Sequence, residues 1–137
     1  MLDMGEPRIK IVAMPKDTNP SGNIFGGWIM SQIDIAGALA AKDLPIERVV
    51  TVAVHSLEFR QPVLVGDIIS CYAKIIKVGN SSITVQVEVN AEKSDNGIRR
   101  CVHVTSATIT YVSVDKDGNK KPINCSKNHL KAIGIDV

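Results

Sequence analysis

Residues 25–41 form an almost wholly apolar run that contains one charged side chain, Asp34. The loop before this run is rich in turn and capping residues, and Pro45 follows it. The sequence therefore predicts one long helix from about Ile24 to Lys42. Because the other extended apolar patterns in the chain are typical of strands, this helix has to pack against a sheet, and that requirement limits the possible folds.

Five β-type runs accompany the predicted helix, one before it and four after it: residues 8–13, 48–59, 67–78, 82–93 and 99–114. The fourth run alternates apolar and polar residues, as a strand with one buried face does. We therefore predict an α+β fold, in which one long central helix lies against a five-stranded antiparallel sheet. Residues 1–137 are expected to form a single domain with its core at about 8–114, and the polar tail, 115–137, receives no assigned structure.

The run at residues 48–59 is apolar on both of its faces, which is typical of a strand that is covered on both sides. One helix leaves the second face and the edges of a sheet uncovered. We therefore expect other subunits to cover them in a homo-oligomer, most simply a two-fold dimer.

The composition is that of an ordinary globular domain, with 45% hydrophobic and 22% charged residues. A net charge of +2 without any Lys/Arg run argues against a nucleic-acid partner. The 25–41 run is too short, and too polar at Ser31, Gln32 and Asp34, to span a membrane. Three widely spaced cysteines and an N-terminus without signal-peptide layout indicate a cytoplasmic protein with reduced thiols.

Asp34 is the first candidate for a functional residue. A carboxylate in an apolar environment is costly to desolvate unless it is paired or used in chemistry. Backbone N–H groups at the start of a helix, here at Gly26 and Gly27, can stabilise a developing negative charge. A structural ion pair at Asp34, and a packing role for the two glycines, stay open as alternatives.

Other catalytic patterns are absent from the sequence. It contains no Gly-x-Ser-x-Gly motif, which argues against a serine hydrolase of that type. His55, His103 and His129 lack the spacing of metal ligands, so we predict no metal site and no prosthetic group. The strand that carries His55 is expected to run beside the helix, and its imidazole could reach the same cleft.

The segment Asn19-Pro-Ser-Gly-Asn-Ile-Phe-Gly-Gly-Trp-Ile-Met-Ser-Gln-Ile-Asp34 resembles the hot-dog-fold acyl-coenzyme A thioesterases, in particular the bacterial YciA type. The resemblance continues through residues 48–54, 59–67 and 77–83 in the same order. It implies a helix wrapped by a five-stranded antiparallel sheet, an acyl-CoA substrate that is hydrolysed to a free acid and coenzyme A, and active sites at a dimer interface. It also implies dimers that assemble as a trimer, although a dimer or a tetramer stays open.

The resemblance assigns roles to several residues. Asp34 matches the catalytic acid, which would either activate a water molecule or attack the thioester carbonyl and form a mixed anhydride. The N–H of Gly27 would face the carbonyl oxygen. Asn23 matches a second catalytic residue that acts from the neighbouring subunit, although an asparagine there could equally cap the helix.

Coenzyme A is expected to lie along a set of small residues: Gly26, Gly79, Ser81 and Ser82. The last three belong first of all to a hairpin turn, and their role as ligands rests on the resemblance. Basic side chains are candidates for contacts to the phosphates of coenzyme A: Arg60, Lys77 and Arg99.

Two other functions remain as alternatives. The first is a non-catalytic acyl-CoA sensor, although the chain shows no DNA-binding helix-turn-helix. The second is an acyl-CoA hydratase or dehydratase of the same fold. Phe25 argues against it, because many hot-dog enzymes carry a histidine at this position.

Overall fold

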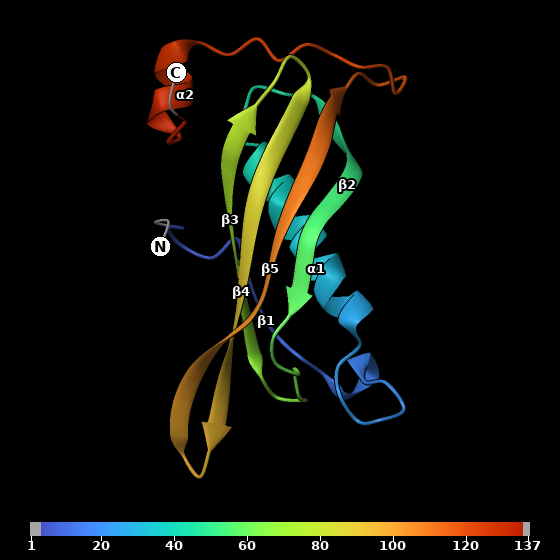
Figure 1. Cartoon of the computed structure of the whole chain (residues 1–137), viewed down its shortest axis with the longest axis vertical. Coiled ribbons are helices and arrows are strands. Elements are labelled where there is room, and N and C mark those ends of the chain that lie inside the picture. Colours follow the sequence, from blue (N-terminus) through green and yellow to red (C-terminus); the bar gives the residue numbers. More distant parts are fainter. Residues whose placement is uncertain (1–3, 136–137) are drawn as a thin grey trace.

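The computed structural model describes residues 4–135 of the chain. Its strands form one antiparallel sheet in the order β1-β3-β4-β5-β2, and helix α1 crosses one face of this sheet (Figure 1). The elements are β1 (Ile9–Val12), η1 (Pro15–Asp17), α1 (Gly26–Ala41), β2 (Arg48–Phe59), β3 (Ile68–Val78), β4 (Ser82–Asp95), β5 (Ile98–Val114) and α2 (Lys127–Ala132). The predicted α+β fold with a central helix on a five-stranded antiparallel sheet is confirmed.

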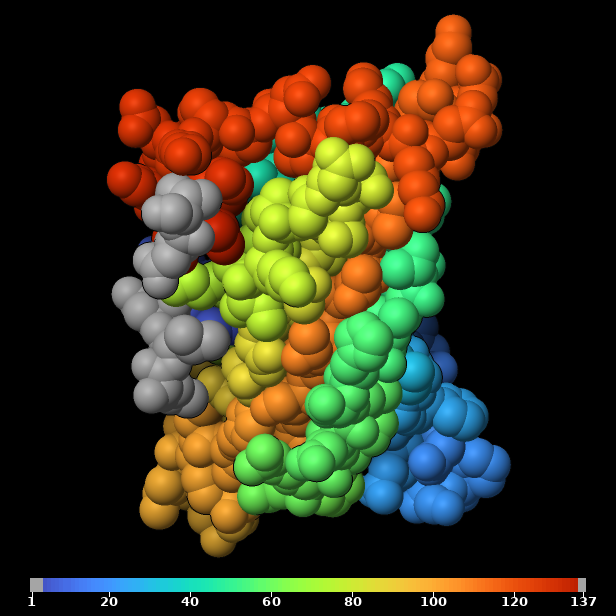
Figure 2. Space-filling model, turned by 45° about the horizontal axis from the view of Figure 1, so that its top comes forward, coloured from blue at the N-terminus to red at the C-terminus, as the bar shows by residue number. Residues whose placement is uncertain are grey.

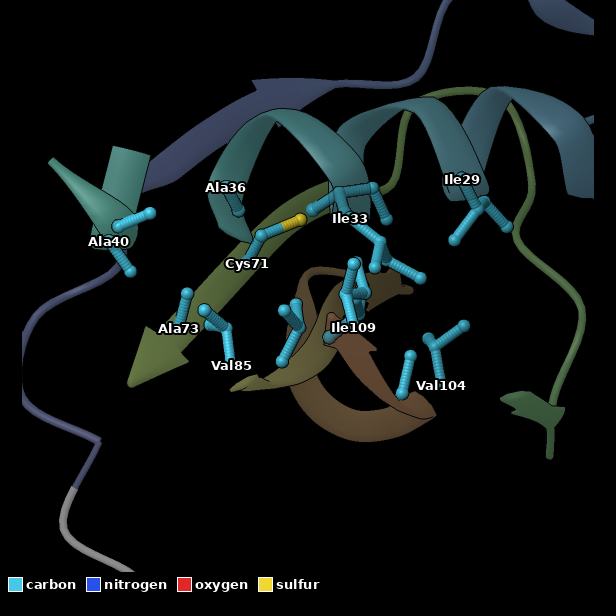
Figure 3. Close-up of a cluster of buried hydrophobic side chains, with 14 of the residues drawn as sticks. Ile29, Ile33, Ala36, Ala40, Cys71, Ala73, Val85, Val104 and Ile109 are labelled. Carbon is cyan, nitrogen blue, oxygen red and sulfur yellow. The ribbon is translucent and has the colours of Figure 1, made fainter. Parts of the chain in front are cut away.

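The core lies between α1 and the sheet, because the alternating strands turn their apolar residues towards the helix. On β4 these residues are fully buried, and they pair with equally buried residues of β5, such as Val85 with Ile109. In Figure 3 the side chains of Ile29, Ile33 and Ala36 point from α1 towards the sheet. The helix is thereby fixed on the sheet over most of its length.

The sharpest turn of the sheet is the one between β4 and β5. Asn96 and Gly97 both have positive φ angles, of 51° and 82°, as a type I′ turn requires. Asn-Gly is the residue pair that this type of turn favours, because both positions need a positive φ angle.

Strand β2 is an edge strand, because it pairs with β5 alone in the described part of the chain. The side chains of Val50, Val52 and Val54 are 45%, 54% and 46% exposed. Nothing within residues 4–135 lies beyond this edge, so the cover that the sequence predicts for β2 would have to come from another chain. An apolar edge strand of this kind is a typical site for pairing with another chain.

The C-terminal tail has more structure than the sequence suggested. It runs over the turn between β3 and β4, where the N–H of Ile123 donates to the carbonyl of Asn80 over 2.8 Å. Figures 1 and 2 show this segment, in orange and red, covering one end of the molecule. It ends in α2, where Ser126 accepts a hydrogen bond from the N–H of His129 and Leu130 packs against the core.

No helix within residues 4–135 is both long enough and apolar enough to cross a membrane.

Candidate active site

A groove of about 360 Å³ lies between α1 and the edge strand β2. The helix contributes polar and apolar residues to it, and the strands contribute mostly apolar ones. The lining residues are Gly27, Met30, Ser31, Ile33 and Asp34 of α1, Thr51, Val54 and Leu57 of β2, and Ile109 of β5. Asp34 is the one ionisable residue among them, so the groove is an apolar channel with a single carboxylate in its wall.

The Asp34 carboxylate is held on one side only. Thr51 Oγ1 donates to Asp34 Oδ1 over 2.7 Å, and the Tyr111 hydroxyl donates to the same oxygen over 3.2 Å. Among residues 4–135, none donates a hydrogen bond to Asp34 Oδ2 or forms an ion pair with the carboxylate. The alternative of a structural ion pair at Asp34 is therefore wrong for the single chain, and one carboxylate oxygen is available to a substrate.

Asp34 is half-buried and not fully buried as its apolar surroundings in the sequence suggested. The reason is the position of the groove: it lies on the flank of α1 that faces the open edge of the sheet. A second chain at that edge would complete the burial.

Tyr111 connects the sheet to the helix beneath the groove. Its side chain is 1% exposed, and its single hydroxyl proton is shared between the main-chain carbonyl of Asp34, at 2.7 Å, and Asp34 Oδ1, at 3.2 Å. Burial, and secondly the charge of Asp34, raise the pKa of Tyr111 far above its ordinary value. The phenol therefore stays protonated and remains a hydrogen-bond donor.

The start of α1 has unused backbone donors. The N-cap residue is Phe25, and no side chain caps the helix. Within the described chain, the N–H groups of Gly26 and Gly27 have no acceptor, as expected for the first residues of a helix. The N–H of Gly27 therefore remains free to bind an oxygen atom in the groove.

Asn23 does not cap the helix, so that alternative is wrong. The helix begins three residues later, and the Asn23 side chain makes no hydrogen bond within residues 4–135. Asn23 lines a second pocket, of about 310 Å³, beside Gly26, Phe59 and Arg60. Asn23 and Asp34 thus lie in different pockets of one chain.

The turn predicted to contact coenzyme A lies between β3 and β4, and none of its residues lines the groove of the single chain. Gly79 and Ser82 close the turn between β3 and β4, with the N–H of Gly79 donating to the Ser82 carbonyl over 2.8 Å. The adjacent carbonyl of Ser81 accepts from the N–H of Ser113 over 2.8 Å. In Figure 1 this turn lies at the tail end of the sheet, whereas the loop that leads into α1 lies at the other end.

The remaining candidates are scattered. Arg60 lies with Asn23 in the second pocket, and Arg99 lies in a shallow pocket near the β4–β5 hairpin. His55 bonds Thr110 on the face of the sheet away from the helix, so the expectation that it reaches the cleft is wrong. A β-bulge beside it, with Ser56 at a φ of 52°, turns the strand there.

Sequence reasoning missed the two side chains that hold Asp34. Thr51 and Tyr111 lie 17 and 77 residues further along the chain, and neither belongs to a local motif. One available signal was Gly37, because an isolated glycine inside an apolar helix usually has a packing reason.

The sequence and the structure can both be compared with known proteins. The family model of the thioesterase superfamily matches residues 21–98, which include Asn23, Asp34 and Thr51. The chain belongs to the thioesterase superfamily. Within this superfamily it is 46% identical over 120 residues to the acyl-CoA thioester hydrolase YciA of Salmonella typhimurium, which covers 87% of this chain and 90% of the relative.

Solved structures of the superfamily agree closely with this fold. A hexameric hotdog-fold thioesterase of Campylobacter jejuni is 58% identical, with a TM-score of 0.90 over 97% of this chain and 99% of the other. A hexameric broad-specificity acyl-coenzyme A thioesterase, solved as an aspartate-to-alanine mutant, is 44% identical with a TM-score of 0.87 over 94% of each chain. The resemblance seen in the sequence is therefore confirmed, and the fold is the hot-dog fold.

Proposed function

We propose that this member of the thioesterase superfamily hydrolyses acyl-CoA to a free acid and coenzyme A, with Asp34 as the base or nucleophile. The observation that carries the proposal is the Asp34 carboxylate in an otherwise apolar groove, with one oxygen held and the other free. The similarity to YciA and to a broad-specificity acyl-coenzyme A thioesterase supports the choice of substrate class.

In the proposed reaction the apolar groove receives the acyl chain. Asp34 Oδ2 either takes a proton from a water molecule that attacks the thioester carbon, or attacks that carbon itself. The N–H of Gly27 stabilises the oxyanion that forms, and the C–S bond then breaks. When Asp34 acts as the base, the proton that it has taken from water passes to the leaving thiolate, which gives the free acid and the thiol. When Asp34 attacks directly, the thiolate leaves a mixed anhydride, and a water molecule then hydrolyses the anhydride to the free acid, regenerates the Asp34 carboxylate and supplies the proton of the thiol. The proposal uses water, the substrate and protein groups, and includes no metal or prosthetic group.

We also propose that a second copy of the chain completes the site. Asn23 and Asp34 line different pockets, the Asn23 amide is unused within the chain, and the apolar edge of β2 is exposed beside the groove. A homodimer formed along β2 would supply Asn23 from the neighbouring subunit. The hexameric state of the similar structures supports a larger homo-oligomer, which we propose to be a trimer of such dimers.

We propose that residues of more than one subunit also contact coenzyme A. Gly26 and the turn formed by Gly79, Ser81 and Ser82 are proposed to lie along the coenzyme A moiety. Because none of the turn residues lines the groove of one chain, we propose that the turn contributes to the site of a neighbouring subunit. A cytoplasmic location is part of this proposal and rests on the spacing of the cysteines.

The test is the release of free thiol from acyl-CoAs of two to eighteen carbons by the wild type and by Asp34→Asn. We expect turnover by the wild type and a loss of at least about 10³-fold in kcat for Asp34→Asn, with retained coenzyme A binding. Asp67→Asn is not a suitable control because Asp67 is buried, so the exposed Asp117→Asn serves instead.

Two results would change the proposal. If wild-type protein binds acyl-CoA without releasing thiol, the chain is a sensor and not an enzyme. If Asp34→Asn turns over normally, the chain is an enzyme with a different base. A single turnover in H₂¹⁸O tests direct attack, because ¹⁸O found in the Asp34 carboxylate would show that an anhydride formed and that water attacked it at the Asp34 carbonyl.

A further inference from the structure

Tyr111 contacts both the backbone and the side chain of the same residue. Its hydroxyl lies 2.7 Å from the main-chain oxygen of Asp34 and 3.2 Å from Asp34 Oδ1. Tyr111 itself is anchored in β5, opposite Ile83 of β4, and is almost fully buried. The buried Tyr111 side chain therefore fixes two things: the distance between the sheet and the turn of α1 that carries Asp34, and the orientation of the Asp34 carboxylate.

The helix makes room for this hydroxyl at Gly37. A β-carbon at residue 37 would lie 2.2 Å from the Tyr111 hydroxyl oxygen and 3.0 Å from Cζ of its ring. Every residue other than glycine would therefore displace the phenol. Glycine is a poor helix former, so its place in the middle of α1 is explained by this contact and not by helix propensity.

The two donors to Asp34 leave a defined oxygen for chemistry. Thr51 and Tyr111 both donate to Oδ1, and their combined direction sets the carboxylate plane. Oδ2 has no hydrogen-bond partner in the described chain, and Asp34 lines the groove. Because the Asp34 carboxylate is already oriented in this way, it does not have to reorganise when the substrate binds.

We propose that Tyr111 is a positioning residue of the thioesterase reaction, which directs Asp34 Oδ2 into the groove by holding Oδ1 and the helix backbone, and that Gly37 is required for its placement. The inference rests on the proposed role of Asp34. Tyr111 is buried and is not among the residues that line the groove, so it is not expected to touch the substrate. The protonated state of the phenol, which burial and the Asp34 charge maintain, keeps the donor in place over the working pH range.

The first test compares Tyr111→Phe with Tyr72→Phe in the full-length oligomer. We expect Tyr111→Phe to lower kcat by about 10- to 100-fold, the usual effect of losing a hydrogen bond to a charged group, and to leave KM within about twofold. Tyr72 lies on the opposite face of the sheet, where it pairs with Glu88, and its hydroxyl makes no hydrogen bond within residues 4–135. Tyr72→Phe should therefore leave both constants unchanged.

A second measurement separates positioning from a merely structural role. In the Asp34→Asn background, Tyr111→Phe should cause no further loss of the residual rate, because its effect passes through the carboxylate. The proposal would be overturned if the two substitutions lowered the rate independently, so that their fold-losses multiplied in the double variant. It would also be overturned if kcat of Tyr111→Phe lay within about twofold of the wild type. If instead Asp34→Asn retains full activity, the proposed role of Asp34 is wrong. This result comes from the single variant alone, so it can be distinguished from a failure of the Tyr111 proposal.

Gly37→Ala tests the position of the Tyr111 hydroxyl without removing it, because the added methyl group would displace the phenol. We expect kcat to fall while coenzyme A binding persists, and we expect the added loss to be smaller in the Tyr111→Phe background, where the closest clash is absent. Should Tyr111→Phe fail to assemble, Gly37→Ala alone decides. Unchanged kcat in Gly37→Ala would show that the phenol position is not needed.

Discussion

Thr51 Oγ1 donates a 2.7 Å hydrogen bond to Asp34 Oδ1, and this bond ties the middle of helix α1 to the edge strand β2. Both residues line the groove, where the other lining side chains of α1 and β2 are mostly apolar. A β-bulge directly follows Thr51 in β2. Bulges commonly re-aim side chains near active sites, and this one sets the direction of the strand beside the carboxylate.

Thr51→Val should impair catalysis with little effect on folding. Valine keeps the shape of threonine and removes the donor, so we expect kcat to fall by about 10-fold and the free energy of unfolding to change by less than about 1 kcal/mol. Thr51→Ser should restore most of the rate. Thr108→Val removes a comparable hydroxyl, which bonds Gln86 on the far face, and should leave kcat unchanged. Equal effects of Thr51→Val and Thr108→Val on steady-state thiol release would contradict the prediction.

Mixed oligomers should recover activity that neither parent has. In a dimer of one Asp34→Asn chain and one Asn23→Ala chain, one of the two shared sites carries both native residues. Random reassembly of equal amounts should therefore restore about a quarter of the wild-type sites, because half of the dimers are mixed. The measurement is thiol release after co-refolding. If Asn23 acts within its own chain, no activity returns.

The ion pair of Lys93 and Asp67 should be important for stability. Lys93 Nζ lies 2.5 Å from Asp67 Oδ2, and the two side chains are only 12% and 8% exposed. Lys93→Met leaves a buried carboxylate without its partner, so we expect the free energy of unfolding to fall by about 3–5 kcal/mol. Lys10→Met, which breaks an exposed pair with Glu92, should cost less than about 1 kcal/mol. Urea unfolding at a fixed protein concentration measures both, and a similar small loss in each would refute the prediction.

Glu88 should contribute a pH-dependent part of the stability. Burial acts to raise its pKa, but hydrogen bonds from Ser106, His103 and Gln86 outweigh this effect and lower the pKa below its ordinary value. A lowered pKa in the folded state stabilises the protein above the ordinary value, and this contribution is lost as the pH falls through the folded-state pKa.

The check on Glu88 is urea unfolding of the wild type and of Glu88→Gln from pH 7 down to pH 3. We expect the wild type to be more stable at neutral pH, and the difference to shrink once the pH falls below about 4. Glu6→Gln, at an exposed position, should behave as the wild type throughout. A difference that stays constant with pH would assign the effect to packing rather than to ionisation.

The strands and the helix were predictable because their signals are local. Alternation in β4 and the Asn96-Gly97 turn depend on residues that are neighbours in the sequence, and the predicted bounds agree with the structure to within about two residues. The status of β2 was not predictable in the same way. The apolar residues of β2 indicate that both faces of the strand are buried in the working protein. They do not indicate whether the residues that bury them belong to the same chain or to another subunit.

The same distinction applies to the site. Asp34 and the glycines at the helix start belong to one segment, so their pattern was visible in the sequence. Thr51 and Tyr111 reach Asp34 only after the sheet has formed, and no local pattern encodes contacts of this length. Helix α2 is six residues long, which is too short for a periodic signal, and its packing on the core is what stabilises it.

The separation of Asn23 from Asp34 in two pockets has a consequence for how the enzyme behaves in solution. If Asn23 and Asp34 act together in a site shared by two subunits, as we propose, a single chain would be inactive when it is alone. Specific activity would then depend on the enzyme concentration itself and would fall on dilution below the dissociation constant of the dimer. Dilution would in this way act as a switch that requires no effector.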